Sequence, residues 1–195
     1  MDIILATWNK IKLQWLTQGF SSLGMNIRPV NSNEIEDVEE TGITSVENAL
    51  IKVRAIGVKP DSIIIGEDSI LAVDALDGFP GAKTARWTEG TDDDRALGLL
   101  EKLKDVPENK RTAKFQSAIA VLFPDGTEET FVGELKGNIS TELKGKSGDG
   151  YLRIFIPAEG QLVGRSGSLT IKEGDHRDQA IKRATSKIEI WRDNH

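Results

Sequence analysis

Short apolar strands that alternate with amphipathic helices constrain the fold of this chain more than any other feature. Met1–Ala6 is short and rich in β-branched residues, which is typical of a buried strand. Lys10–Leu23 follows it with apolar residues at helical spacing, and Gly24 marks the end of that helix. Ser62–Gly66 (SIIIG) has the pattern of a buried central strand. Strands and helices in alternation predict an α/β chain.

The middle of the chain has a different character. Thr112–Phe123 and Thr127–Lys136 are β-rich, and Pro124-Asp125-Gly126 between them is a hairpin signal. Arg177–Trp191 is helical in pattern again, so β-rich material between helical ends predicts a mixed sheet. Further strands are expected at Met25–Val30, Ser69–Leu76 and Tyr151–Ile156, and a further helix from Thr91 to Leu103. Another helix is expected after a capping box at Thr44–Glu47, in which Glu47 is assigned to capping.

The composition excludes several classes of protein. The chain has 195 residues, enough for one domain or two closely joined lobes, and its net charge of −6 argues against a protein that works on duplex nucleic acid. It has no cysteine, which excludes disulfides, thiolate nucleophiles and zinc sites built from cysteine. No apolar segment approaches the roughly 20 residues that span a bilayer, and Ile3–Ala6 is too short for a secretory leader. We therefore expect a soluble protein, and a reducing cytoplasm suits it.

A candidate phosphate site lies where the first strand leads into the first helix. Thr7 and Asn9 stand at this junction, and Lys12 follows one turn into the helix. A helix N-terminus offers free backbone N–H groups and a positive dipole to an anion, and a lysine there adds a full charge. The plainer interpretation is that Asn9 caps the helix and that Lys12 is solvated.

Acidic residues form two further candidate segments. Glu40 lies near the end of an acidic loop, before the helix that carries Lys52. The segment Gly66-Glu67-Asp68-Ser69 stands at the end of the predicted strand Ser62–Gly66, and ligands of open α/β sheets bind at the carboxyl ends of strands. Mg²⁺ takes one or two protein carboxylates and completes its shell with water and substrate phosphates. The plainer interpretations are a solvated charged loop and an ordinary turn.

Several longer motifs occur in a fixed order along the chain. They stand at Thr7, Asn9 and Lys12, at Glu40–Thr44, at Glu47–Lys52, at Asp68–Gly81 with Thr84-Ala85-Arg86, at Arg111–Phe115 and at Phe131–Ile139. In this order and spacing they resemble the Ham1/RdgB-type inosine triphosphate pyrophosphatases, a family that hydrolyses non-canonical purine nucleoside triphosphates. The resemblance runs from the first strand to about residue 180.

The chain departs from this family's pattern where the base would bind. Asp149 replaces the aromatic residue that stacks on the base, and Leu152 replaces the family's aspartate. Asp175 stands in place of a serine, and Lys172 lies one position nearer to that site than the family's lysine. Because a carboxylate accepts hydrogen bonds from amino groups, the base preference is expected to shift toward an amino-bearing base. The base-binding residues implied by the resemblance are Asp149, Leu152, Lys172, Asp175, His176 and Arg177.

The resemblance also implies a reaction. It implies Mg²⁺-dependent hydrolysis of nucleoside triphosphates of the ITP, XTP or dITP type, between the α- and β-phosphates, to a monophosphate and pyrophosphate. Glu40 and Asp68 would hold the metal ion, and Asp68 would position or deprotonate the attacking water. The implied catalytic residues are Asp68, Glu40 and Lys52, and the implied phosphate-binding residues are Thr7, Asn9, Lys12, Lys52 and Ser69.

The fold implied by the resemblance is an ITPase-like (Maf/Ham1) α/β fold. It has an elongated mixed sheet flanked by helices and two lobes with a cleft between them, here in a single domain over residues 1–195. A cytoplasmic homodimer without nucleic-acid or membrane partners is also implied. Two alternatives remain: a Maf-like pyrophosphatase of modified or pyrimidine nucleotides, and a non-catalytic nucleotide-binding regulatory protein. The complete set of phosphate and metal residues argues against the second alternative.

Overall fold

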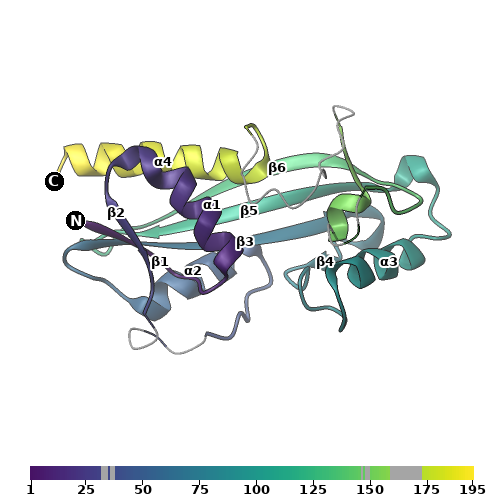
Figure 1. The fold of residues 1–195 in the computed structure, drawn as a ribbon, viewed down its shortest axis with the longest axis horizontal. Coiled ribbons are helices and arrows are strands. Elements are labelled where there is room, and N and C mark those ends of the chain that lie inside the picture. The colour runs from purple at the N-terminus through teal and green to yellow at the C-terminus, as the bar shows by residue number, and fades with distance from the viewer. Residues whose placement is uncertain (32–34, 36–37, 146, 148–149, 159–172) are drawn as a thin grey trace. The chain divides into compact units, whose positions relative to one another are not determined.

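The computed structural model describes all residues except 32–34, 36–37, 146, 148–149 and 159–172 (Figure 1). Helices and strands follow one another along the chain, as the sequence patterns predict. The elements are β1 (Asp2–Leu5), α1 (Lys10–Phe20), β2 (Asn26–Pro29), α2 (Ser45–Ile56), β3 (Ser62–Val73), β4 (Pro80–Gly81), α3 (Asp92–Lys102), β5 (Thr112–Leu122), β6 (Glu128–Ile139), β7 (Phe155–Pro157) and α4 (His176–Asp193). Among the described residues, no helix is long and apolar enough to cross a membrane.

The described strands form one mixed sheet in the order β2-β1-β3-β5-β6-β7, and β4 pairs with β3. β1 runs parallel to both β2 and β3, whereas β6 and β7 are antiparallel. The predicted hairpin turn joins β5 to β6, where the N–H of Phe123 donates to the carbonyl of Thr127. The expected α/β class with a mixed sheet flanked by helices is therefore confirmed.

Contacts divide the chain into two units. Unit 1 contains residues 1–69, 117–133 and 169–195, and unit 2 contains residues 70–116 and 134–168. Strands β3, β5 and β6 contribute residues to both units. The core of unit 2 is built around α3, β3, β5 and β7, and includes Leu99, Val73, Phe115 and Phe155.

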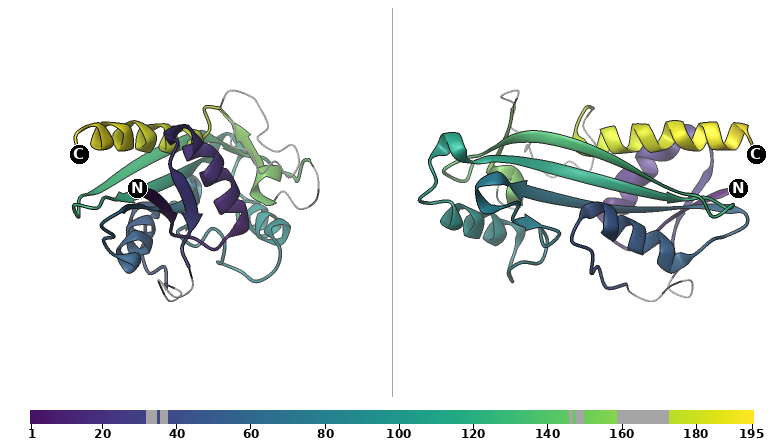
Figure 2. Two further views of the ribbon diagram at one scale, coloured as in Figure 1. Left: turned by 60° about the vertical axis from the view of Figure 1, so that its left-hand side comes forward. Right: turned by 180° about the vertical axis from the view of Figure 1, so that it is seen from behind.

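In unit 1 the strands β1 and β3 bury both of their faces. Ile3 and Ile63 pack against α1 and α4, while their neighbours Ile4 and Ile64 pack against α2. This alternation follows from the two-residue period of a strand, which sends successive side chains to opposite faces. Figure 2 shows α1 and α4 on one face of the sheet and α2 on the other. Apolar residues at every position of a short strand are therefore the mark of a strand covered on both sides.

The sequence-based division of β3 into two strands, Ser62–Gly66 and Ser69–Leu76, is wrong. One strand runs from Ser62 to Val73, and Glu67 and Asp68 lie within it. Gly66 is no strand end; a Cβ on Gly66 would come within 2.5 Å of the carbonyl oxygen of Ala49 in α2, so glycine permits the close approach of that helix. The strand can continue through two acids because both are buried beside lysine ammonium groups.

The helix termini agree with the sequence signals, whereas one of the short predicted strands does not agree with the structure. Thr44 and Thr91 each form a capping box, and Glu47 completes the first of these, as predicted. Gly24 has a positive φ of 63° after the short 3₁₀ turn that extends α1. The expected strand at Tyr151–Ile156 is partly wrong, because Tyr151 lies in a 3₁₀ turn (Gly150–Arg153) and its hydroxyl donates to the carbonyl of Thr84.

Candidate active site

Two lysines and three carboxylates of unit 1 form one cluster. Lys12 comes from the first turns of α1 and Lys52 from α2, while Glu67 and Asp68 lie side by side on β3. Glu40 approaches from the loop before α2. Five charged groups from four segments of the chain therefore meet at one place, as the sequence motifs predict for four of them.

Lys52 occupies the centre of one side of this cluster. Its ammonium nitrogen lies 2.7 Å from Oε1 of Glu40 and 3.4 Å from Oδ1 of Asp68. It also donates a hydrogen bond of 2.9 Å to the backbone carbonyl of Glu67. The carboxylates of Glu40 and Asp68 consequently converge on a single positive charge.

Lys12 pairs with the other acid of the strand. Its ammonium lies 2.9 Å from Oε2 of Glu67 and 3.9 Å from Oδ1 of Asp68. Burial works against the charged form of Lys12, but the two carboxylates raise the pKa of the ammonium above its usual value. Lys12 is therefore a permanent cation at neutral pH, although it lies largely inside the protein.

Glu67 is the most fully enclosed group of the cluster. Its Oε1 accepts hydrogen bonds from the hydroxyls of Ser69 and Ser117, the second at 3.0 Å. Burial alone would raise the pKa of Glu67, but the nearby Lys12 and the Ser69 hydroxyl outweigh it and lower the pKa to about 2. Glu67 is therefore a fixed anion, with two hydroxyl donors on Oε1 and the ammonium of Lys12 beside Oε2.

Asp68 has a different environment. Its only described polar contacts are at 3.4 Å or more: Asn48 donates to Oδ2 at 3.4 Å, and the lysines lie at 3.4 and 3.9 Å from Oδ1. Burial raises the pKa of Asp68, although Lys52 and Lys12 oppose the rise. A carboxylate with a raised pKa and long contacts is suited to accept a proton.

Asn48 connects Asp68 to the loop that carries Glu40. Asn48 is fully buried; its side-chain oxygen accepts from the backbone N–H of Gly42 at 2.8 Å while its nitrogen donates to Asp68. A Cβ on Gly42 would clash with this same amide, because it would lie 2.6 Å from the Asn48 oxygen. The amide therefore fixes the loop and the acid relative to one another.

The helix N-terminus beside Lys12 is capped. The side-chain oxygen of Asn9 accepts from the N–H groups of Ile11 and Lys12 at 2.9 and 3.2 Å. The hydroxyl of Thr7 accepts from the N–H of Asn9 at 3.2 Å. Asn9 thus acts as a cap, as the plainer interpretation has it, and the phosphate-binding roles of Thr7 and Asn9 stay predictions.

The residues implied for the base are only partly described. Asp149 and Lys172 lie outside the described residues. Leu152 belongs to unit 2, where it packs against that unit's core. Asp175 caps α4 by accepting from the N–H groups of residues 177 and 178, at 2.8 and 2.9 Å.

His176 and Arg177 open α4 in unit 1. His176 is buried, and its burial together with the charge of Arg177 lowers the pKa of His176 to about 4. The guanidinium of Arg177 lies over the ring of Trp15, 5.3 Å from its centre, and its charge helps to lower the pKa of Glu67. This pair is therefore electrostatically linked to the acidic cluster, and His176 is neutral at pH 7.

The cluster fits a divalent ion held by two protein carboxylates. No group of three or more His, Asp or Glu side chains among the described residues is arranged to hold a metal ion. Glu40 and Asp68 nevertheless share one cation, the ammonium of Lys52, and they are hard oxygen donors of the kind that Mg²⁺ selects. Such a site would depend on water and substrate phosphate for its remaining ligands.

Sequence reasoning missed three residues of the cluster. Glu67 and Asn48 lie beside or within the motifs, but the motifs indicate no chemical role for them, and Ser117 lies in a β-rich segment without any signal. Glu67 stands next to a predicted metal ligand, which is the one signal that could have drawn attention to it. Ser117 is found only through the pairing order of the sheet, in which β5 lies beside β3.

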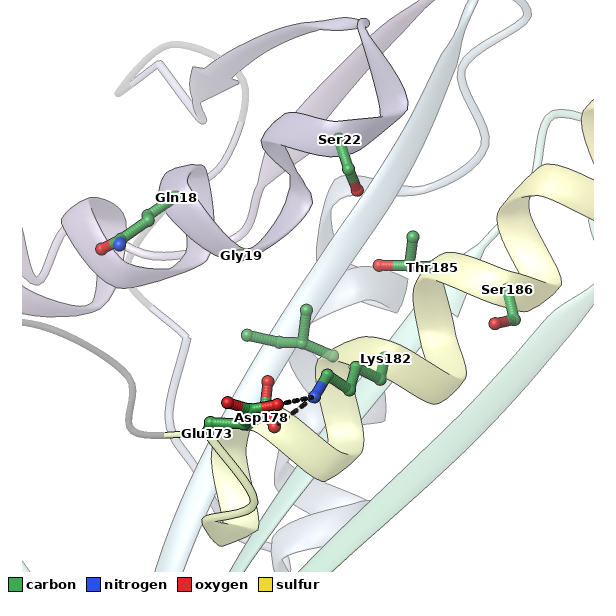
Figure 3. Close-up of a pocket in the computed structure, with 9 residues that line it drawn as sticks. Gln18, Gly19, Ser22, Glu173, Asp178, Lys182, Thr185 and Ser186 are labelled. Carbon is green, nitrogen blue, oxygen red and sulfur yellow. Dashed lines mark ion pairs between the residues drawn. The ribbon is translucent and has the colours of Figure 1, made fainter.

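A separate pocket of about 650 Å³ lies between α1 and α4 of unit 1 (Figure 3). In it Lys182 pairs with Asp178 at 2.9 Å and lies 3.9 Å from Glu173. None of the predicted site residues lines it. Its lining consists of Gln18, Gly19, Ser22, Glu173, Asp178, Ile181, Lys182, Thr185 and Ser186.

Comparison with known proteins is consistent with this arrangement. Residues 3–187 match the Ham1 family. The chain is 45% identical over 190 residues to a protein of Halalkalibacterium halodurans named non-canonical purine NTP pyrophosphatase homolog, covering 97% of this chain and 96% of that protein. It is 40% identical over 187 residues to the dITP/XTP pyrophosphatase of Symbiobacterium thermophilum, covering 95% of this chain and 94% of that protein.

Solved structures show the same fold. The structure of a HAM1 protein from Coxiella burnetii superposes with a TM-score of 0.84 at 28% identity and covers 97% of this chain and 98% of that one. The Ham1 protein of Staphylococcus aureus gives a TM-score of 0.81 at 29% identity, with the same coverage of both chains.

Proposed function

The chain belongs to the Ham1 family, and we propose that it is a nucleoside triphosphate pyrophosphatase that hydrolyses non-canonical purine nucleotides. Its relatives carry the names non-canonical purine NTP pyrophosphatase homolog and dITP/XTP pyrophosphatase. The observation that carries the proposal is the cluster itself. Lys12, Lys52, Glu40 and Asp68, which are separated along the chain, lie within 4 Å of one another in consecutive pairs.

The two lysines are suited to bind the triphosphate. Phosphoryl transfer needs the charge on the phosphate oxygens to be neutralised and the reacting groups to be aligned, and little else from the protein. Lys12 and Lys52 offer two ammonium groups near the same oxygen of Asp68, at 3.9 and 3.4 Å from Oδ1. They would bind phosphate oxygens. The hydroxyl of Ser69 donates to Glu67, so Ser69 would have to give up that hydrogen bond to donate to a phosphate, and its predicted phosphate-binding role stays a prediction.

Asp68 is proposed to accept the proton of the attacking water. The water oxygen bonds to the α-phosphorus, the bond from that phosphorus to the bridging oxygen breaks, and pyrophosphate leaves with the electron pair. The water proton passes to Asp68, whose raised pKa makes it a better base than an exposed aspartate. Asn48 keeps the carboxylate in place during this step.

Glu40 and Asp68 would hold a divalent ion, for which Mg²⁺ is the proposal. A bound ion of this kind would neutralise phosphate charge and stabilise the leaving group. The preferred base stays a prediction, since Asp149 lies outside the described residues. The homodimer also stays a prediction, which light scattering on the purified protein can test.

A nucleotide panel tests the proposed function. The protein is incubated with Mg²⁺ and each of ITP, XTP, dITP, the common nucleotides and modified pyrimidine nucleotides, and pyrophosphate and orthophosphate are measured separately. Pyrophosphate release from purine analogues is expected. Turnover confined to modified or pyrimidine nucleotides would favour the Maf-like alternative, binding without turnover would favour a regulatory protein, and orthophosphate alone would contradict α–β cleavage.

A further inference from the structure

Glu67 has no assigned role in the proposed reaction, yet it is the most deeply buried acid of the cluster. Its side chain has no exposed surface, whereas the side chain of Lys12 is 25% exposed. We propose that Glu67 is a positioning residue, which together with Ser117 holds the ammonium of Lys12 at the triphosphate site. The inference rests on the proposed pyrophosphatase activity.

Both oxygen atoms of Glu67 lie next to groups of the protein. Oε1 accepts from the hydroxyls of Ser69 and Ser117, and Oε2 contacts the ammonium of Lys12 at 2.9 Å. Oε1, with two donors, has no lone pair left, and the side chain of Glu67 has no exposed surface through which solvent could reach it. Asp68, by contrast, has only long contacts. The two adjacent acids of β3 therefore have different roles: Asp68 takes part in the reaction, and Glu67 holds Lys12.

Lys12 needs Glu67 as a partner because a second carboxylate, that of Asp68, competes for its ammonium group. A lysine side chain has four flexible carbon–carbon bonds, and ordering it costs conformational entropy. Asp68 lies 3.9 Å from the same ammonium. Without the charge of Glu67, Lys12 would pair with Asp68, and that pairing would both withdraw the lysine from the phosphates and lower the basicity of Asp68.

Ser117 extends this arrangement to a second strand. It is fully buried on β5, which lies next to β3 in the sheet, and its hydroxyl donates to Glu67 at 3.0 Å. With Ser69 on one side and Ser117 on the other, the carboxylate of Glu67 cannot rotate without losing a hydrogen bond. The position of Lys12 is thus set by a fully buried residue.

Four variants, three of which form a double-mutant cycle with the wild-type protein, test the proposal. The variants are Ser117→Ala, Glu67→Gln, Lys12→Gln and the double variant Lys12→Gln/Glu67→Gln, with Ser140→Ala as the control. Ser140 is another buried serine, whose hydroxyl donates to a backbone carbonyl in unit 2. Each protein is assayed for kcat and KM with the best nucleotide and for binding of pyrophosphate and of Mn²⁺ by calorimetry. Thermal unfolding is the check on folding.

We expect the variants to bind the nucleotide and pyrophosphate more weakly, and not only to have a lower kcat. Ser117→Ala should raise KM and the dissociation constant of pyrophosphate by about threefold, and Glu67→Gln by about tenfold or more. Glu67→Gln should add less than about twofold when Lys12 is already glutamine, because the two residues act through one contact. Ser140→Ala should leave both constants unchanged.

Three results would overturn the proposal. They are unchanged pyrophosphate binding in both Ser117→Ala and Glu67→Gln, additive effects of Lys12→Gln and Glu67→Gln, and loss of Mn²⁺ binding in Glu67→Gln, which would make Glu67 a metal ligand. If Glu67→Gln does not fold, Ser117→Ala decides alone. Pyrophosphate binding needs no turnover, so an inactive wild-type protein would refute the proposed function and leave this test in force.

Discussion

The ammonium of Lys52 lies 2.7 Å from Oε1 of Glu40. The same nitrogen is 3.4 Å from Oδ1 of Asp68, so the two acids proposed to hold the divalent ion already share one positive charge. A divalent ion and an ammonium repel each other strongly at such short range. We therefore expect Lys52 to leave the two acids and move to a phosphate oxygen when the ion and the triphosphate bind.

Lys52→Gln is expected to tighten Mn²⁺ binding in the absence of nucleotide by up to about tenfold, because it removes the competing charge. The same variant should lose most pyrophosphate release, since a phosphate loses its partner. Calorimetry or electron paramagnetic resonance with Mn²⁺ measures the first effect directly. Lys104→Gln serves as the control, because Lys104 pairs with Glu101 on the surface of unit 2. Equal or weaker Mn²⁺ binding in Lys52→Gln would contradict the expected exchange of cations.

Asp68→Asn is expected to lower kcat by about 10²- to 10⁴-fold, the usual contribution of a general base. The amide keeps the shape of the side chain and its neighbour Asn48, so the fold should be retained. Stopped assays of pyrophosphate release measure the loss, and circular dichroism checks the fold. Asp61→Asn, at an exposed position of unit 1, is the matched control. Near-normal turnover of Asp68→Asn would remove Asp68 from the mechanism.

Much of the fold could be predicted from local signals. The capping boxes at Thr44 and Thr91 mark two helix starts correctly, and the apolar segment at Ile63 identifies a strand covered on both faces. The continuity of β3 could not be predicted, because Glu67 and Asp68 resemble a strand end until the lysines that neutralise them are known. Those lysines lie on two different helices, and only the tertiary packing of these helices against β3 brings them next to the acids.

The candidate site divides in the same way. Lys12, Lys52 and Asp68 stand in motifs of fixed spacing, and the structure brings them together. Ser117 stands in no motif, and only the placement of β5 beside β3 brings its hydroxyl to Glu67. A hydrogen bond between strands that are far apart in sequence leaves no trace in the composition of either segment.

Gly66→Ala is expected to destabilise the protein by about 1–3 kcal/mol, the usual cost of overpacking a core. The added methyl group would come within 2.5 Å of the carbonyl oxygen of Ala49 and 3.3 Å of Cβ of Lys52, so α2 would have to move away from β3. Because Lys52 moves with that helix, KM for the nucleotide should rise as well. Urea unfolding and steady-state kinetics measure the two effects.

Two outcomes of the Gly66→Ala experiment would count against this explanation. One is a wild-type unfolding free energy, which would mean that α2 accommodates the methyl group without cost. The other is a destabilised protein with unchanged KM, which would mean that α2 can shift without moving the ammonium of Lys52.

Acid is expected to destabilise the fold below about pH 6.5 through His176. Burial and Arg177 lower the pKa of His176 from its ordinary value of 6.5 to about 4, so between these values the unfolded chain binds a proton that the native protein does not. This contribution to stability is fully present above pH 6.5 and is lost progressively as the pH falls from 6.5 through 4. By pH 5 the loss is about 2 kcal/mol. The chain has two histidines, and the other, His195, lies exposed at the end of α4. Urea unfolding at pH 7, 6 and 5 should therefore show falling stability in the wild-type protein and a much flatter profile in His176→Gln; equal slopes in the two proteins would show that His176 is not the group responsible.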